Sequence, residues 1–455
     1  MPSDLLTNIL TRIHEAAAYN SFPDWYIDQL CTHENIWGSD ISVKVTDPQN
    51  PAQKIWQVFP MVRIHHRRPD NSWIFGGGWR HHPNVTLEMM KSHAIEMSFK
   101  GWIMGIPHGG AKGGIAFDPR KYSKEDTIAI VCKAVEEAIK RNCIGPRRDR
   151  WAPDVNTNED IMKWIQDHYS HIVGLDGPVQ SEACTTGKPV NAGGIPGRKQ
   201  ATGRGLHYAL QIFRSLTDGN AEVILPEHPT VILQGFGNVG YHFAKLCDGF
   251  GLKIIGVLDQ YGGVYHPNLP IADLISYVDG NPRKTVAGFH EICGGDELID
   301  DKELFSIPAD IAVPAALEEV ITPEIASLLN VKVLLEAANG PTVPEADPIL
   351  ADRAIKVIPD IYANSAGYLV SYFEWEQDTH VRPFDILLHP PQWREEDLVF
   401  TAMHDAFNRN GKSIIRLKRN LEATTGHPID YRLASYLYAM ERVLPIYAMK
   451  RKEEL

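Results

Sequence analysis

The chain has 455 residues, 44% hydrophobic and 22% charged, which is enough for two domains with well-filled cores. Its formal net charge of −12, without a Lys/Arg run, argues against nucleic-acid binding and favours a small-molecule partner. No stretch approaches the ~20 apolar residues that span a bilayer. Six cysteines without CxxC spacing predict neither a zinc site nor disulfides, which fits a cytoplasmic protein.

The first part of the chain mixes helical and β-rich patterns. Its opening, "MPSDLLTNILTRIHEAAAYN", places apolar residues at helical spacing, and its charged residues are unlike a secretion signal. A β-rich run, "KIWQVFPMVRIHH", comes later. The Gly/Pro-rich stretch "TTGKPVNAGGIPGRKQATGRG" then predicts a domain boundary near residue 200.

Beyond that boundary, apolar β-rich runs alternate with helical segments, as in "TVILQGFG", "LKIIGVLD", "DIAVPAA", "VKVLLEAAN" and "IKVIPDI". This alternation predicts an α/β fold with a doubly wound parallel sheet. We therefore expect a substrate-binding and oligomerisation domain at 1–200 and a Rossmann-type dinucleotide-binding domain at 201–427. From about residue 395 the pattern is helical, and a last helix, about 428–455, is expected to pack back on the first domain.

The segment "TVILQGFGNVG" carries a GxGxxG motif at Gly235, Gly237 and Gly240, between a predicted strand and a predicted helix. Glycines there permit a tight turn, a close approach of the backbone to a pyrophosphate, and tight helix packing. The next strand ends at Asp259, near the position of an acid that binds ribose hydroxyls. Because no Arg or Lys occurs in 260–263, we expect NAD rather than NADP. The alternative is a tight turn without a ligand.

Lys112 stands among five glycines in "GIPHGGAKGGIAFD". The spacing excludes a phosphate-binding P-loop, which needs GxxxxGK[ST], and leaves a solvated loop lysine as the plain alternative. A lysine enclosed by glycines near another cation would have a lowered pKa and could act as a general base. Lys100 in "EMSFKGW" and Asp154 in "RWAPDVNTNED" could anchor a carboxylate and exchange a proton beside it.

Eight blocks occur in one order: "MSFKGW", "IPHGGAKGGIAFDP", "APDVNT", "GKPVNAGGIPGRKQATGRG", "LQGFGNVG", "VPAAL", "EAANGPTVPEAD" and "SYFEWEQ". From about residue 60 onward the chain resembles the glutamate/leucine/phenylalanine/valine dehydrogenases, and its length and last block look most like the glutamate branch. The resemblance implies two domains that close over a cleft and a homo-oligomer, commonly a hexamer.

The resemblance also implies roles for individual residues. Lys112 matches the lysine that activates water, Asp154 the aspartate that exchanges protons with the amino group, and Lys100 the lysine that holds the α-carboxylate. The positions that match cofactor contacts, or residues lining the nicotinamide and substrate cleft, are Thr202, Asn238, Asn339 and Asn364.

The chain departs from the glutamate branch in the stretch "FGGGWR", where Gly76 replaces the lysine that pairs with the side-chain carboxylate of glutamate. The companion serine is retained as Ser371, but bulky Tyr368 replaces a small apolar residue three positions earlier. One interpretation is an apolar or aromatic substrate. The other is that the charge comes from elsewhere, with Arg67, Arg68 and Arg80 as candidates.

The leading hypothesis is an NAD-dependent L-amino-acid dehydrogenase, which converts an L-amino acid reversibly to a 2-oxo acid and ammonia. The alternative is a catalytically weak relative that binds NAD and a metabolite for regulation. Adjacent histidine pairs lack good chelating geometry, so no metal is expected at His65, His66, His81 and His82.

Overall fold

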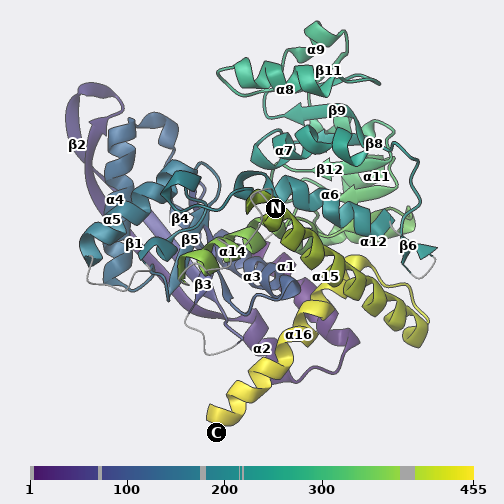
Figure 1. The fold of residues 1–455 in the computed structure, drawn as a ribbon, viewed down its shortest axis with the longest axis horizontal. Coiled ribbons are helices and arrows are strands. Elements are labelled where there is room, and N and C mark those ends of the chain that lie inside the picture. The colour runs from purple at the N-terminus through teal and green to yellow at the C-terminus, as the bar shows by residue number, and fades with distance from the viewer. Residues whose placement is uncertain are drawn as a thin grey trace. The chain divides into compact units, whose positions relative to one another are not determined.

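The computed structural model describes residues 5–69, 74–174, 181–214, 216–217, 220–379 and 395–454. The chain divides into two compact units (Figure 1). The first unit comprises Pro2–Arg198, Tyr368–Thr401 and Ala439–Leu455, and the second comprises Lys199–Gly367 and Ala402–Tyr438.

The first unit is built on a five-stranded sheet of order β1-β2-β4-β3-β5. β1, β2 and β4 pair antiparallel, whereas β3 is parallel to both β4 and β5. The strands are β1 (His33–Asp47), β2 (Asn50–His66), β3 (Phe75–His81), β4 (Gly109–Ile115) and β5 (Asp149–Pro153). The helices before residue 198 are α1 (Leu5–Tyr19), α2 (Asp24–Cys31), α3 (Leu87–Met104), α4 (Lys124–Lys140) and α5 (Glu159–Val173).

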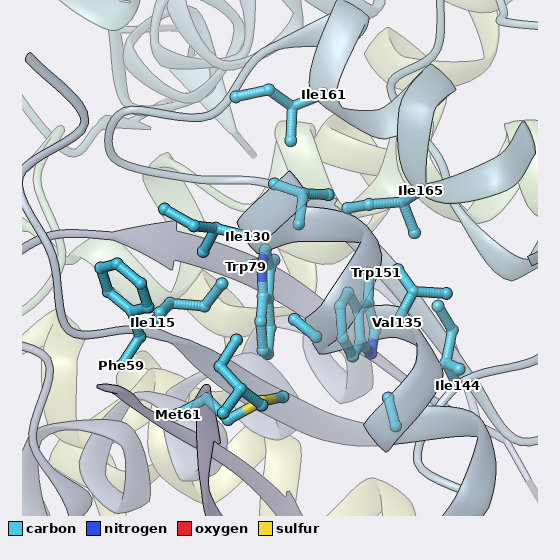
Figure 2. Close-up of a cluster of buried hydrophobic side chains, with 14 of the residues drawn as sticks. Phe59, Met61, Trp79, Ile115, Ile130, Val135, Ile144, Trp151, Ile161 and Ile165 are labelled. Carbon is cyan, nitrogen blue, oxygen red and sulfur yellow. The ribbon is translucent and has the colours of Figure 1, made fainter. Parts of the chain in front are cut away.

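One face of this sheet is mainly apolar. Trp79 of β3 and Trp151 of β5 are fully buried and stack at 3.8 Å between ring centroids, a contact worth about 1 kcal/mol beyond its area burial. Isoleucine and valine side chains of α4 and α5 pack around this pair (Figure 2). Because side chains alternate along a strand, the neighbours of these tryptophans point to the opposite face, where α3 lies against β4.

Glycines let the strands and α3 approach more closely than any side chain permits. A Cβ atom at Gly77 would lie 1.7 Å from the Ala111 carbonyl oxygen, and one at Gly110 would lie 2.2 Å from that of Ala94 on α3. The glycine-rich sequences of β3 and β4 are therefore a requirement of packing, and both strands are buried along their whole length.

The second unit contains a seven-stranded sheet of order β11-β10-β9-β8-β12-β13-β14, in which β9, β8, β12, β13 and β14 are parallel. This is the doubly wound arrangement expected from the alternating pattern, so the fold is α/β with two domains. The strands are β8 (Thr230–Gln234), β9 (Lys253–Asp259), β10 (Gly262–Tyr265), β11 (Asp296–Leu298), β12 (Ile311–Pro314), β13 (Val333–Leu335) and β14 (Lys356–Ile358), with a separate pair β6 (Leu216–Thr217) and β7 (Asn220–Ala221).

Short helices connect these strands: α6 (Ala201–Arg214), α7 (Asn238–Leu246), α8 (Ile271–Gly280), α9 (Phe289–Cys293), α10 (Asp301–Ser306), α11 (Pro323–Leu328), α12 (Asp347–Asp352) and α13 (Asp360–Ala363). Three further helices contribute residues to both units: α14 (Ala366–Thr379), α15 (Glu395–Thr425) and α16 (Tyr431–Glu454).

The units differ from the sequence division in two places. Residues 368–379 and 395–401, expected in the dinucleotide-binding domain, cluster with the first unit, and the last helix is shared, with only 439–454 of it in the first unit. The physical reason for the first difference is that α14 carries buried polar side chains whose partners precede residue 198, such as Ser371, which bonds Thr186. Thr186 and Ser371 are 185 residues apart in the sequence, so a local sequence pattern cannot predict their hydrogen bond.

We expect Gly77→Ala to destabilise the protein by about 3 kcal/mol or to prevent folding, because the added methyl group meets a backbone carbonyl that cannot move without breaking the sheet. Gly38→Ala in β1 of the same sheet is the matched control, since its Cβ would have only ordinary contacts at 3.8 Å. Thermal or urea unfolding of the two variants measures the difference. Equal stability would contradict the close approach of β3 and β4.

Candidate active site

The GxGxxG turn lies between β8 and α7, and its three glycines have three different environments. Gly235 has φ +91°, and a Cβ there would lie 2.7 Å from Ala315 after β12. A Cβ at Gly240 would lie 2.0 Å from the Gly235 carbonyl oxygen, so α7 can pack on the turn only with glycine there. At Gly237 nothing lies within 4 Å of the Cβ position, which is open space where a pyrophosphate can approach the N-terminus of α7. The turn therefore fits a dinucleotide.

Asp259 is the last residue of β9, and its carboxylate is held by three donors. Its Oδ1 accepts hydrogen bonds from the Tyr261 amide at 2.8 Å and the Thr285 hydroxyl at 2.9 Å, and its Oδ2 accepts one from the Val286 amide at 2.9 Å. Sequence analysis missed the loop that supplies the last two donors, because it returns to β9 more than twenty residues later. That loop also carries exposed Arg283 and Lys284.

The remaining predicted cofactor residues lie at element ends in the second unit. Asn238 begins α7 and donates from Nδ2 to the Lys199 carbonyl at 3.0 Å. Asn364, buried after α13, donates to the Ala338 carbonyl at 3.0 Å and to Oδ1 of Asn339 at 3.2 Å. These bonds bring Asn339 and Asn364 together after β13. Thr202 is half-buried in the first turn of α6.

Lys112 and Asp154 form a buried ion pair in the first unit. The Lys112 amine lies 3.2 Å from Oδ2 of Asp154, which also accepts a hydrogen bond at 2.9 Å from Nε of Arg80. Lys112 is on β4, Arg80 is on β3, and Asp154 follows β5, so three adjacent strands supply the groups. Gly78 of β3 makes room for them, because a Cβ there would lie 2.8 Å from Cβ of Asp154 and 3.2 Å from the amine.

The sequence predicts that the glycines next to Lys112 enclose its amine. In the structure the glycines next to Lys112 in β4 mostly meet backbone atoms instead, such as Val62 at Gly113 and Arg80 at Gly114. They bury the lysine by closing the sheet, not by lining a pocket for the amine.

The surroundings lower the pKa values of both groups, for different reasons. Burial lowers the pKa of the Lys112 amine; Asp154 opposes this, while Arg80 and Lys100 add to it. Although burial disfavours its ionisation, Arg80 and Lys112 hold the pKa of the Asp154 carboxyl well below its usual value. The pair thus combines an ionised carboxylate with an amine that gives up its proton more readily than a free lysine.

Lys100, near the end of α3, is buried and contributes to the field at Lys112. Glu96, one turn earlier on α3, receives a contact from His93 at 3.0 Å. Burial raises the pKa of Glu96, but His93, Lys100 and Lys112 outweigh it and hold the carboxyl below its usual value. Three cations, Lys100, Lys112 and Arg80, therefore face two carboxylates, Asp154 and Glu96, which leaves an excess of positive charge suited to a carboxylate ligand.

In the structure, the cation next to Gly76 is Arg150, which is none of the three arginines proposed from the sequence. Arg150 of β5 is in register with Gly76 and is fully buried, and a Cβ at Gly76 would lie 2.5 Å from its Cζ. Sequence analysis missed Arg150, although its alternation with Trp151 in "RDRWAPD" indicates a strand with one charged face. Of the three arginines proposed instead, Arg67 contacts Thr32, Arg68 pairs with Glu34, and Arg80 pairs with Asp154 beside Lys112.

Tyr368 and Ser371 lie one turn apart on α14 and are both buried. The Tyr368 ring lies over the Arg150 guanidinium, with Cζ 5.1 Å from the ring centroid, and its edge is 2.7 Å from the Cβ position of Gly101. The Ser371 hydroxyl is 2.6 Å from that of Thr186. Glycine at 101, next to Lys100, thus accommodates the bulky tyrosine.

Three further findings concern the described residues alone. No group of three or more His, Cys, Asp or Glu side chains in them could hold a metal ion, and His65 and His66 bond Asp149 and Ser98 instead. All six cysteines are free thiols. No helix within the described ranges combines the length and the apolar character needed to cross a membrane.

Comparison with known proteins extends these observations. A family model described as glutamate/leucine/phenylalanine/valine dehydrogenase matches residues 193–445, and the dimerisation-domain model of the same family matches 40–171. The chain is 37% identical to a glutamate dehydrogenase of Thermotoga maritima, over 87% of each chain. It is 36% identical to an NADP-specific glutamate dehydrogenase of Synechocystis sp., over 97% of this chain and 96% of the relative, and to an NAD-specific one of Staphylococcus aureus, over 80% of each.

Among solved structures, a hetero-hexameric glutamate dehydrogenase of Thermus thermophilus with leucine bound is similar, with a TM-score of 0.80 and 25% identity over 99% of this chain and 98% of that one. The two family models together cover most of the chain, and their order follows that of the two units. With the GxGxxG turn and the buried lysine–aspartate pair, these matches show that the chain belongs to the glutamate/leucine/phenylalanine/valine dehydrogenase family, in its glutamate dehydrogenase branch.

Proposed function

We propose that the protein catalyses the reversible, NAD-dependent oxidative deamination of an L-amino acid. The amino acid, NAD⁺ and water give the 2-oxo acid, NADH, ammonium and a proton. The observation that carries this proposal is the buried contact of 3.2 Å between the Lys112 amine and Asp154, with the pKa of the amine lowered. Bound nicotinamide supplies the acceptor for the hydride that leaves the substrate Cα.

The chain's own residues bind the substrate and move its protons. Lys100 holds the α-carboxylate by charge. The neutral amine of Lys112 takes a proton from the water that attacks the imino carbon, and it returns that proton as the amino group leaves. Asp154 exchanges protons with the amino group, while Arg80 keeps its carboxylate ionised and in place.

The alternative of a regulatory protein without turnover is not favoured. The relatives reported above are named as glutamate dehydrogenases, and the buried lysine–aspartate pair is retained. We further propose a homo-oligomer. The dimerisation-domain model supports association of chains, and the Thermus relative, which is a hetero-hexamer, supports an oligomer but not its identical subunits. The cytoplasmic location stays a prediction.

Asp259 supports NAD as the cofactor. Its carboxylate would repel a 2′-phosphate, and after three protein donors it retains room for one ribose hydroxyl, since a carboxylate offers about four lone-pair positions. Arg283 and Lys284 in the adjoining loop are the cations that could favour NADP instead, and relatives of both specificities exist.

We expect Lys112→Ala to lower kcat by about 10²–10⁴-fold, because it removes the group that accepts the proton of water. NADH binding, measured by fluorescence titration, should stay unchanged. Lys140→Ala, at an exposed surface lysine, is the matched control and should keep full activity. Equal rates for Lys112→Ala and wild type in NADH formation with all twenty amino acids would disprove the mechanism.

The pH profile gives a second test. Lys112 must be neutral to act, so the deamination rate should rise with pH and level off below ~10.4, the pKa of an unperturbed lysine. Arg80→Met removes a nearby positive charge, so Lys112 should hold its proton to higher pH and the rising limb should move to the alkaline side. Arg80→Lys keeps the charge and should leave the limb near its wild-type position. A shift to lower pH in Arg80→Met would contradict the assignment.

For the cofactor, we expect a higher kcat/KM with NADH than with NADPH in reductive amination. Asp259→Ser should narrow this preference about tenfold or more, because it removes both a charged hydrogen bond to the ribose and the repulsion of a phosphate. Asp273→Ser, at an exposed position of α8, is the control. A preference for NADPH that Lys284→Ala abolishes would instead assign the 281–286 loop to a 2′-phosphate.

A further inference from the structure

Arg150 is a buried cation at the place where Gly76 has no side chain. Its side chain is fully buried, and its guanidinium occupies the space into which a side chain at position 76 would extend. Any residue larger than glycine at position 76 would collide with it, since the Cβ would lie 2.5 Å from Cζ and 2.8 Å from Nε. Gly76 on β3 and Arg150 on β5 therefore depend on each other. The guanidinium of Arg150 can occupy this space because residue 76 has no side chain.

The hydrogen bonds of the guanidinium are incomplete. Nη1 donates to Nδ1 of His108 at 2.7 Å, but among the described residues neither Nε nor Nη2 has an acceptor. The Tyr368 hydroxyl, whose ring covers the guanidinium, has no partner with good hydrogen-bond geometry among the described residues, and Arg150 is its polar neighbour. Three N–H groups, one on Nε and two on Nη2, therefore have no acceptor in one buried place, and they match the lone pairs of a carboxylate.

No neighbouring group in the described ranges neutralises this charge. Asp149 precedes Arg150, but alternation along β5 turns it to the other face, where it pairs with Arg63 at 2.6 Å and His65 at 2.8 Å. Burial, and after it the Arg150 charge, lower the pKa of His108 to about 2, so that histidine is neutral. A buried cation without a counter-ion is costly, and the arrangement is relieved when an anion binds.

The position of the guanidinium relative to the Lys112–Asp154 pair suits a substrate whose side chain carries an acid group beyond the amino group on which the pair acts. Gly76 and Gly78 are two residues apart on β3, and their Cβ positions point to the same face of the sheet. Arg150 lies next to Gly76, and the Lys112–Asp154 pair lies next to Gly78. Two residues of a strand correspond to about 7 Å, which is the separation of these two groups along β3.

One neighbour must yield for a carboxylate to reach the buried donors. Trp375, which also faces the guanidinium at 5.9 Å, is fixed by a hydrogen bond from Nε1 to the Pro146 carbonyl at 2.8 Å. His108 is fixed by its bond to Nη1. The Tyr368 ring lies over the guanidinium, with its hydroxyl near Arg150, and we infer that it is the neighbour that moves to admit a carboxylate.

We propose that the Arg150 guanidinium binds the side-chain carboxylate of the substrate, in place of the lysine that position 76 lacks, so that the enzyme acts on an acidic L-amino acid. This inference rests on the proposed dehydrogenase function and chooses between the two substrate classes that the sequence left open. An apolar side chain would bury the guanidinium without an acceptor, which penalises leucine and similar substrates.

The test compares kcat/KM for glutamate, aspartate, glutamine, norvaline and leucine in wild type, Arg150→Met and Arg150→Lys. We expect the wild type to prefer an acidic substrate, and Arg150→Met to lose about 30-fold or more on it, mainly through KM. The same variant should keep or improve its rate on norvaline, which a merely structural role of Arg150 would not allow. The double variant Gly76→Lys with Arg150→Ala moves the charge back to β3 and should regain part of the preference, whereas Gly76→Lys alone should fold poorly.

A binding measurement separates this inference from the proposed function. Glutarate, a dicarboxylate without an amino group, should raise the unfolding temperature of the wild type but not of Arg150→Met, while valerate should affect neither. Without ligand, Arg150→Met should unfold at the wild-type temperature or higher, since it removes an unpaired buried charge. If Arg150→Met does not fold, Arg150→Gln serves in its place.

A wild type that prefers leucine or norvaline, or equal stabilisation of wild type and Arg150→Met by glutarate, would overturn the role of Arg150. No turnover of any amino acid, together with stabilisation by glutarate that needs Arg150, would overturn the dehydrogenase function alone.

Discussion

The candidate site depends on one steric constraint: two neighbouring strands carry almost no side chains where they face α3. Gly76 and Gly78 leave space above β3, and the glycines of β4 let α3 and the adjacent strands come into backbone contact. Long cationic side chains from β4 and β5 fill the space above β3. An alanine in either position would exclude the guanidinium or the lysine–aspartate pair. Removing side chains from one strand is therefore what allows charges from its neighbours to be buried there.

The two-residue alternation of the strands separates the Lys112 and Arg150 side chains from the tryptophan pair, although the tryptophan face also buries the ion pair of Asp149 with Arg63. Trp79 and Trp151 point to the face covered by α4 and α5, whereas Arg80 and Arg150, their neighbours in sequence, point to the other. Burial on the charged side is strong enough to lower the pKa of Lys112 against the attraction of Asp154. The same low polarity that tunes the lysine makes the unpaired guanidinium unfavourable, so the two effects have one cause.

Sequence reasoning succeeded where the determining contacts are local. Gly235, Gly237 and Gly240 belong to a strand, a turn and a helix that are contiguous, and the structure places this turn between β8 and α7. Their contact with a dinucleotide stays a prediction. Arg150 opposite Gly76 depends on the register of β5 against β3, across more than seventy residues, and no periodicity encodes it. The loop that returns Arg283 and Lys284 to Asp259 was missed for the same reason. The pairing of Lys112 with Asp154 was expected from family resemblance, since composition alone leaves both as ordinary surface residues.

β5 has only five residues, yet it supplies Arg150 and leads directly into Asp154. A slip of one residue against β3 would exchange its two faces, placing Trp151 among the charges and the guanidinium in the apolar core. Asp149 opposes such a slip, because it is held by Arg63 from β2, two strands beyond its own neighbour. The ion pair of Asp149 with Arg63 thus fixes the register of β5. The alignment of Arg150 and Asp154 in the site therefore depends on a contact that does not touch the substrate.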